Sequence, residues 1–348
     1  MPQQPGHPAH PDWPHAISVG LLRLILPAIF VVADGYAAAG SADTLHAWNG
    51  GPTKTALVQF VKDVTTEGGP DYVPPAERIA VFSNDGTLAP ELPCGVQLAF
   101  ALDRVKALAA KHPQWRSKEP FRSALARNMS ALAAQGVRGS LQLVAATCSG
   151  MSTDEFSETV RSWLEKARNA RLNRRYTQCP YLPMQELLAF LRGNGFTCYL
   201  ISSGDLAFMR IWAEKAYGMD PDQVIGSPCR MKFQVRKSGS VLIRLPEFDL
   251  LGEGAVRPGG IDRAMGRRPI AAFGSADSDL EMLQYATGGS GRHIGLIIHH
   301  TNGGNEFAYD RKAAFGRLDK ALDAAKKSGW VIADMTKDWN RVFTKVEK

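Results

Sequence analysis

The chain has 348 residues, of which 45% are hydrophobic and 22% are charged, a composition typical of a soluble globular protein with one large or two modest domains. Its formal charge is +7 at pH 7, and its sequence pI is about 9.2. The sequence contains no zinc-finger spacing, basic heptad repeat or aromatic-basic sheet signature, so we expect no nucleic-acid partner. The positive charge instead favours small phosphorylated or other anionic molecules as partners.

The N-terminal segment has the features of an export signal. Arg23 precedes a short apolar run, Leu24–Ala33, and small residues follow at Ala37–Ala39. This order predicts a signal peptide over residues 1–39, with a mature chain that starts near Gly40. We therefore expect an exported protein, periplasmic or secreted, without stable membrane contact once the signal is removed. An uncleaved segment that anchors the protein in a membrane is the alternative.

The cysteines do not indicate a metal site. No two of them have C-x-x-C spacing, so ligation of a metal by thiolates is not expected. Export would permit disulfides, but the odd count leaves at least one thiol unpaired, and the pairing cannot be read from the sequence. Cys198 lies inside an apolar run, where we expect it to pack as a small apolar side chain. The five cysteines are Cys94, Cys148, Cys179, Cys198 and Cys229.

The first expected strand is followed by a long helical block. Ile79–Phe82 is a continuous apolar run that ends on a polar turn, the pattern of a buried strand. Apolar residues then recur at helical spacing through residues 96–185, and Ser152–Glu155 reads as a capping box that begins a helix. Leu141–Ala145 is the one candidate strand in this block.

Helices and strands alternate in the second half of the chain. The expected helices cover Met184–Leu191, Leu206–Tyr217, Leu280–Tyr285 and Leu318–Lys327. The expected strands cover Thr197–Ile201, Pro269–Phe273, His293–Ile298 and Trp330–Ala333, with a hairpin from Met231–Val235 and Val241–Leu245.

This alternation predicts an α/β fold built on a doubly wound parallel sheet with helices on both faces. The helical block interrupts the α/β pattern after its first strand. We therefore expect an α/β core formed by residues 45–95 and 186–348, with residues 96–185 inserted as a helical lobe over the carboxyl edge of the sheet.

Three of the expected strands end in polar turns that carry hydroxyl or carboxyl groups. These turns are Ser83–Thr87, Ser202–Asp205 and Gly274–Asp279, and a basic, glycine-rich segment, Arg257–Gly260, lies between the last two. Such turns offer carboxylates for a hard cation, together with a hydroxyl and helix N-termini for an anion. A fixed positive charge completes the components that phosphoryl transfer requires.

The order of these motifs resembles the haloacid dehalogenase-like superfamily, in particular its exported phosphatases of the phosphoserine-phosphatase-like or nonspecific acid phosphatase kind. The resemblance covers about Trp48–Phe343 and extends beyond the motifs, to "NGGPTKTALVQFVKDVTTEGGPDYVPPAERIAVF", "FMRIWAEKAYGMDPDQVIGS" and "GRRPIAAFG". It implies a Rossmann-like core with a helical cap, a Mg²⁺ cofactor and a small phosphorylated substrate.

The resemblance also implies roles for the first two turns. In the family motif D-x-D-G-T the first Asp attacks phosphorus, and the second is the general acid and base. Ser83 stands at the position of the first and Asp85 at the position of the second. Ser202 matches the hydroxyl that holds a phosphate oxygen, and we expect further substrate contacts from Thr87, Ser203 and Gly204.

The remaining motifs imply a cation and metal ligands. Arg257 stands where the family has Lys, and Asp279 matches the last acid of the fourth motif. Ser275 occupies a position where Asp or Asn is usual, and Asp277 matches an acid of this subgroup. With Ser83 and Asp85, these residues are the expected Mg²⁺ ligands. Asp205 replaces the family's Gly and is expected to add negative charge near the phosphate site.

The serine at the attacking position leaves the activity open. A serine hydroxyl is a poor nucleophile without an adjacent base, so we expect phosphatase activity to be impaired. One hypothesis is a phosphomonoester hydrolase with residual activity, in which metal-bound water attacks and Asp85 is the base. The other is a non-catalytic pseudophosphatase that binds an anionic or phosphorylated ligand, or a partner.

Several of these residues also have structural interpretations. Ser202 is expected to cap the following helix as well as line the anion site. Arg257 could be an ordinary surface charge, and Asp279 could stabilise a helix N-terminus. His299 and His300 are expected to be structural, because neighbouring residues on a strand point to opposite faces.

Overall fold

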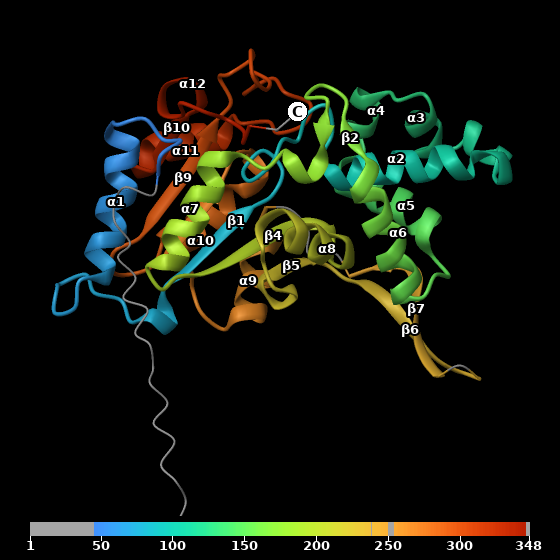
Figure 1. The fold of residues 1–348 in the computed structure, drawn as a ribbon, viewed down its shortest axis with the longest axis horizontal. Coiled ribbons are helices and arrows are strands. Elements are labelled where there is room, and N and C mark those ends of the chain that lie inside the picture. Colours follow the sequence, from blue (N-terminus) through green and yellow to red (C-terminus); the bar gives the residue numbers. More distant parts are fainter. Residues whose placement is uncertain (1–44, 238, 250–253, 346–348) are drawn as a thin grey trace, which may run out of the picture. The chain divides into compact units, whose positions relative to one another are not determined.

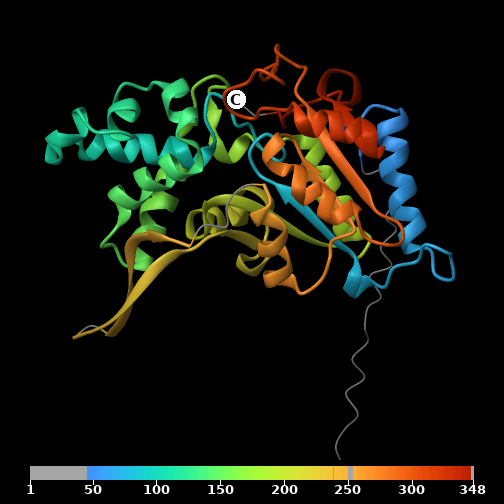
Figure 2. The same ribbon diagram turned by 180° about the vertical axis from the view of Figure 1, so that it is seen from behind.

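The computed structural model describes residues 45–237, 239–249 and 254–345, so the predicted signal peptide lies outside the described residues. The core is a six-stranded parallel sheet of order β10-β9-β8-β1-β4-β5, which confirms the predicted α/β class (Figure 1, Figure 2). Its strands are β1 (Ile79–Ser83), β4 (Thr197–Asp205), β5 (Val224–Ser227), β8 (Ala271–Gly274), β9 (Ile294–His299) and β10 (Val331–Asp334).

Strand β1 lies at the centre of the sheet. All five of its residues are buried, as expected for a parallel strand covered on both faces. It pairs on one side with β4, Ile79 opposite Thr197, and on the other side with β8, Ala80 opposite Ala271. The chain moves outward from β1 to β5 and then crosses to β8, so the strand order reverses beside β1. Open α/β sheets bind ligands at such a point.

Alternate residues of β1 enter two apolar clusters, one on each face of the sheet. Ala80 and Phe82 pack with helices α1 (Pro52–Thr65), α7 (Leu182–Gly193) and α8 (Leu206–Tyr217), and Phe82 stacks on Phe273 at 4.4 Å between ring centroids. Val81 packs on the opposite face with helices α9 (Val256–Met265), α10 (Leu280–Thr287) and α11 (Lys320–Ser328). A short helix, α12 (Met335–Asp338), follows β10.

All five cysteines are free thiols with buried side chains. Cys198 lies in β4 with 0% of its surface exposed, which confirms that it packs as an apolar residue. Burial raises the pKa of its thiol to about 12, so this thiol remains protonated at neutral pH.

The expected helical block is formed by five helices. The Ser152 capping box is confirmed: the Glu155 backbone N–H donates to Ser152 Oγ at 3.2 Å, and the Ser152 N–H donates to Glu155 Oε2 at 2.7 Å. The candidate strand Leu141–Ala145 is wrong, because it lies inside α5, where buried residues recur at helical spacing. The helices are α2 (Val96–Leu108), α3 (Phe121–Leu125), α4 (Met129–Ala134), α5 (Gly136–Cys148) and α6 (Thr153–Lys166), and the short strands β2 (Arg168–Asn169) and β3 (Arg174–Arg175) follow them.

The predicted hairpin is confirmed as the antiparallel strands β6 (Cys229–Arg236) and β7 (Gly239–Phe248), which project away from the sheet (Figure 1). Strand β7 packs on α5 and α6, and Ile243 forms a bridge with Ser152. The hairpin therefore contacts the helical block, although its sequence lies in the second part of the core. The domain limits 45–95, 96–185 and 186–348 stay predictions.

A buried ion pair joins the core to this hairpin. Arg244 on β7 donates to the carboxylate of Asp205 at the start of α8, and both side chains are at most 2% exposed. The guanidinium also lies 3.7 Å above the Phe156 ring of α6. Asp205 Oδ1 accepts from the Ala207 N–H at 2.8 Å, which caps α8. The negative charge that Asp205 was expected to add near the phosphate site is therefore compensated by Arg244.

We expect Arg244→Met to lower the free energy of unfolding by about 3 to 5 kcal/mol, because it leaves the Asp205 carboxylate buried and unpaired. The double variant Asp205→Asn/Arg244→Met should lose less, since Asn keeps the helix cap without a charge. Urea unfolding measures both. The exposed pair Arg230–Asp249 of the same hairpin supplies the control, where Arg230→Met should cost less than about 1 kcal/mol. A double variant as unstable as the sum of its single changes would contradict this account.

Candidate active site

A cavity of about 330 Å³ opens where β1, β4 and β8 end beneath the helical block. Most of the predicted site residues meet here, while Thr87, Ser275 and Asp279 lie behind its wall. The core contributes Ser83, Asn84, Asp85, Glu91, Ser202, Ser203, Gly204, Arg257 and Asp277, and the helical block contributes Gln97, Leu98, Ala133, Gly136, Val137 and Ser140.

Asp85 presents its carboxylate to this cavity from the turn that follows β1. The residue is exposed within the cavity, and desolvation by the surrounding protein raises the pKa of Asp85 to about 6. Asn84 Nδ2 donates to Asp85 Oδ1 at 2.7 Å, which opposes the rise by stabilising the ionised form. Gly95 must be glycine, because a Cβ there would lie 2.8 Å from the carboxylate oxygens. Asp85 is therefore a base at neutral pH whose orientation is fixed.

Asn84 was missed at the level of sequence, although it holds Asp85 in place. Its Oδ1 accepts from Trp212 Nε1 at 3.0 Å and from the Tyr217 hydroxyl at 2.9 Å. These contacts leave Nδ2 directed at the Asp85 carboxylate. Asn84 and Trp212 are at most 2% exposed, so both side chains are also fixed by packing. The sequence offered only an asparagine inside the motif, because its partners lie more than a hundred residues away.

Ser83 ends β1 opposite Ile201 and lines the cavity with 5% of its surface exposed. Across the described ranges, no carboxylate or imidazole forms a hydrogen bond with its hydroxyl. A serine nucleophile needs such a base. Ser83 thus presents a hydroxyl that no base among the described residues activates.

The C-terminal end of β4 brings Ser202, Ser203 and Gly204 to the same cavity. Ser202 Oγ accepts from the Gly204 N–H at 3.1 Å, which closes a local turn. The expectation that Ser202 caps the following helix is wrong, because Asp205 is the N-cap of α8. Gln97 of the helical block reaches this turn and accepts from the Asp205 N–H at 2.8 Å. A Cβ on Gly204 would lie 2.5 Å from Gln97 Oε1, so a larger residue there would displace the Gln97 side chain from this turn.

Arg257 lies on α9, where its side chain is 5% exposed and pairs with Asp279. The interpretation of Arg257 as an ordinary surface charge is therefore wrong. Its Nε has no hydrogen-bond partner among the described residues, although the atom is buried. Arg257 lines the cavity, as does Arg317, so the core side presents positive charge to the space that Ser202 and Asp85 also line.

Three other predicted residues have structural contacts. Thr87 Oγ1 donates to Ser275 Oγ at 3.1 Å, and Ser275 Oγ donates to the Asp85 carbonyl at 3.3 Å, which ties the first and fourth motifs together. Thr87 is 0% exposed and does not reach the cavity. Asp277 Oδ1 accepts from the Asp319 N–H at 2.8 Å and the Ala321 N–H at 2.9 Å, at the start of α11.

The expected Mg²⁺ ligands are only partly available. Mg²⁺ prefers carboxylate oxygens and water in an octahedral arrangement. Among the five expected ligands, Asp85 presents a carboxylate to the cavity, whereas Asp279 accepts from Arg257 and the Ser275 and Ala276 N–H groups. In the part of the chain that the structure describes, no three His, Cys, Asp or Glu side chains are grouped to hold a metal ion. The residues in this arrangement do not fit a Mg²⁺ site.

Glu91 is a second carboxyl group on the cavity wall, and sequence reasoning missed it. Burial, supported by the charges of Asp85 and Asp279, raises the pKa of Glu91 to about 8. The Tyr309 hydroxyl donates to Glu91 Oε1 at 2.8 Å. The Tyr309 ring stacks on His300, whose Nε2 donates to the Gly86 carbonyl at 2.8 Å. The segment after β9 thus supports the turn that carries Asp85, and His300 is structural as expected.

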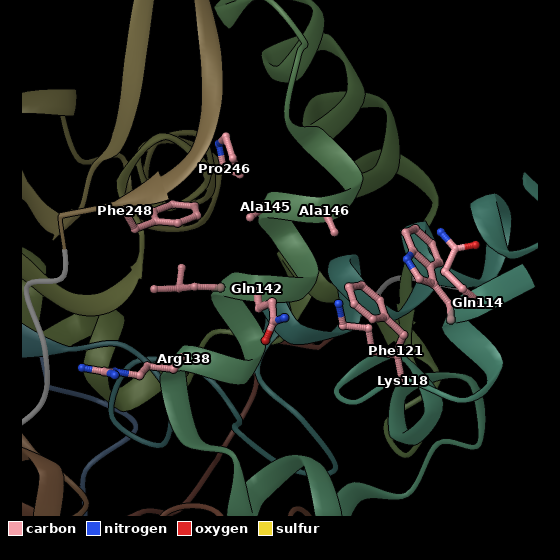
Figure 3. Close-up of a pocket in the computed structure, with 11 residues that line it drawn as sticks. Gln114, Lys118, Phe121, Arg138, Gln142, Ala145, Ala146, Pro246 and Phe248 are labelled. Atoms are coloured by element: carbon pink, nitrogen blue, oxygen red, sulfur yellow. The ribbon is translucent and has the colours of Figure 1, made fainter. Parts of the chain in front are cut away.

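A second cavity, of about 530 Å³, lies on another side of α5 and holds none of the predicted site residues (Figure 3). Its walls are mainly apolar, with Phe121 and Phe248 on either side of Ala145 and Ala146 (Figure 3). Helix α5 therefore separates the two cavities: Gly136, Val137 and Ser140 line the first, and Leu141, Gln142, Ala145 and Ala146 line the second.

Known proteins resemble this chain in sequence and in fold. A model of the haloacid dehalogenase-like hydrolase family matches residues 80–284, which is more than half of the chain. The structure of a conserved, functionally unknown protein from Anaerococcus prevotii aligns over 80% of this chain and 90% of that protein, at 14% identity. The TM-score of 0.50 indicates that the two folds are similar. The structure of a phosphoserine phosphohydrolase-like protein from Francisella tularensis aligns over 64% of this chain and 87% of that protein, at 16% identity and with a TM-score of 0.37. No curated protein matches the chain.

The raised pKa of Glu91 predicts a pH-dependent stability. The folded chain holds the Glu91 proton up to about pH 8, whereas the unfolded chain releases it near its ordinary value of 4.5. Stability from this group is therefore fully present below pH 4.5 and declines as the pH rises towards 8. We expect the melting temperature of Glu91→Gln, relative to the unaltered protein, to rise between pH 5 and pH 8 in EDTA. The exposed Glu77→Gln is the control, and a parallel shift in both variants would contradict the assignment.

Proposed function

Because the chain belongs to the haloacid dehalogenase-like hydrolase family, we propose that its cavity binds small phosphorylated compounds and that it hydrolyses phosphomonoesters slowly. The observation that carries this proposal is the convergence of Asp85, the Ser202–Gly204 turn and Arg257 on one cavity. These groups come from three separate parts of the chain, and each matches a motif position of the family.

Anion binding follows from the groups on the core side of the cavity. Arg257 supplies positive charge, and a guanidinium presents several N–H donors to phosphate oxygens. Ser202 supplies a hydroxyl donor beside them. The helical block closes the opposite side with Gln97, Val137 and Ser140, so it faces the part of the substrate that leaves.

Slow hydrolysis follows from the chemistry of Asp85 and Ser83. With a pKa of about 6, Asp85 is largely ionised at neutral pH and can accept a proton from water. The water oxygen forms the new bond to phosphorus as the ester oxygen departs, and the protonated Asp85 returns the proton to the departing alkoxide. Ser83 lacks a base, so the covalent step of the family is lost and the rate falls.

A second candidate function is phosphate-compound binding without turnover. Two observations favour it: no base contacts the Ser83 hydroxyl among the described residues, and the Asp279 carboxylate is taken up by Arg257 and two backbone N–H groups. A family fold alone does not establish catalysis. For either function, we propose a site of action outside the cytoplasm, on the basis of the signal predicted for residues 1–39.

We expect Ser83→Asp to raise hydrolysis of p-nitrophenyl phosphate on the order of a hundredfold or more, because it restores the attacking carboxylate. The assay contains Mg²⁺, which the family resemblance implies, and is repeated in EDTA. Ser83→Asp/Asp85→Asn should lose this gain, since the proton acceptor is removed. Equal rates for the unaltered protein and Ser83→Asp would contradict the assigned role of position 83.

Binding of inorganic phosphate distinguishes the two functions. Thermal stabilisation of the unaltered protein by phosphate, weakened by Ser202→Ala, supports the cavity as an anion site. If phosphate binds and neither protein turns over the ester, the non-catalytic function stands. If phosphate does not stabilise the unaltered protein, both functions fail.

A further inference from the structure

The hairpin β6–β7 has a net positive charge, and its one acidic residue, Glu247, lies near its base. Between Gln223 and Pro246 the sequence has five basic residues and no acidic residue. Arg244 is the one buried member of this set and anchors the base of the hairpin on Asp205. The other four, Arg230, Lys232, Arg236 and Lys237, are exposed.

One face of the same hairpin is apolar and exposed. Met231, Phe233 and Val235 alternate along β6, so their side chains point to one face, and Leu242 joins them because it pairs with Phe233. Their exposed fractions are 38% for Met231, 63% for Phe233, 78% for Val235 and 43% for Leu242. Among the described residues, these are four of the five large apolar side chains that are exposed, so the exposed apolar surface is concentrated here.

We propose that this hairpin docks on an anionic lipid surface. Met231, Phe233, Val235 and Leu242 would enter the boundary between headgroups and acyl chains. Lys232 and Arg236 alternate with them on β6 and therefore lie on its opposite face. Their long side chains would bend around the narrow two-stranded hairpin so that their charged ends reach the acidic headgroups. No helix in the described ranges is long and apolar enough to cross a membrane, so the contact is peripheral. It is reversible and independent of the predicted signal peptide.

Charge distinguishes this partner from a second copy of the chain. A two-fold dimer through this face would bring two hairpins of net positive charge together. Their acidic residues, Glu247 and Asp249, lie at the base of the hairpin, where Asp249 already pairs with Arg230. An anionic surface neutralises the same charges. Nucleic acid is less well matched, because three of the four exposed apolar side chains, Met231, Val235 and Leu242, are aliphatic, and Phe233 alone of this set offers a ring on which a base could stack.

Vesicle sedimentation of the full chain tests the charge requirement. We expect binding to vesicles of phosphatidylglycerol and phosphatidylcholine, and at least about tenfold weaker binding for Lys232→Glu/Lys237→Glu. The matched control is Lys326→Glu/Lys327→Glu on α11, where both lysines are exposed and lie outside the hairpin. Thermal unfolding of each variant shows that it is folded.

A probe on the hairpin separates its contact from any contact of the N-terminal segment. The five native thiols are buried, so an introduced cysteine is labelled selectively. An environment-sensitive fluorophore on Val235→Cys should shift to the blue with acidic vesicles. The same fluorophore on Val256→Cys, an exposed position on α9 with 49% exposure, should not shift.

Three results would overturn the proposal. The first is equal binding of Lys232→Glu/Lys237→Glu and the unaltered chain, which would assign any membrane contact to another segment. The second is an unshifted probe at Val235. The third is a dimer in solution that Phe233→Ser dissociates, which would identify the covering partner as a second copy.

Discussion

The parallel pairing of β1 with β4 on one side and β8 on the other is the constraint on which the site depends. It places the ends of three strands side by side, so Ser83, Ser202 and Ser275 come together although they are far apart in the chain. The register is set by a continuous apolar run in β1 that is buried on both faces. The polar groups at the cavity are therefore brought together by the packing of the sheet on which they stand.

Burial determines which charges remain available to a ligand. Asp279 is compensated by Arg257, and Asp205 by Arg244. A buried charge without such compensation is costly, so these acids are held by their partners. Asp277, which also lines the cavity, accepts from two backbone N–H groups through Oδ1. Asp85 and Glu91 are the other carboxyl groups on the cavity wall, and desolvation raises the pKa of both. The site thus combines one available base with little fixed negative charge, which suits an anionic ligand.

The alternation of elements and the positions of the polar turns were readable from the sequence, because apolar periodicity and turn residues are local signals. The residues that hold the site's side chains in place could not be predicted from the sequence. Asn84 is held in place by a hydrogen bond from Trp212, and Glu91 by one from Tyr309, which lies 218 residues away from Glu91 in the chain. Leu141–Ala145 is too short an apolar run to distinguish strand from helix. The contact of the hairpin with the helical block likewise depends on a buried arginine, Arg244, whose partner no local pattern identifies.

Helix α5 is a shared wall, since Ser140 faces one cavity and Gln142 the other. A ligand that displaces this helix from either side therefore alters the space available on the opposite side. Thermodynamic linkage makes such an influence reciprocal: if a ligand in one cavity changes the affinity of the other cavity for its ligand by some factor, the second ligand changes the affinity for the first by the same factor. Two compounds bound in the separate cavities would then compete or cooperate through a displacement of helix α5, without contacting each other.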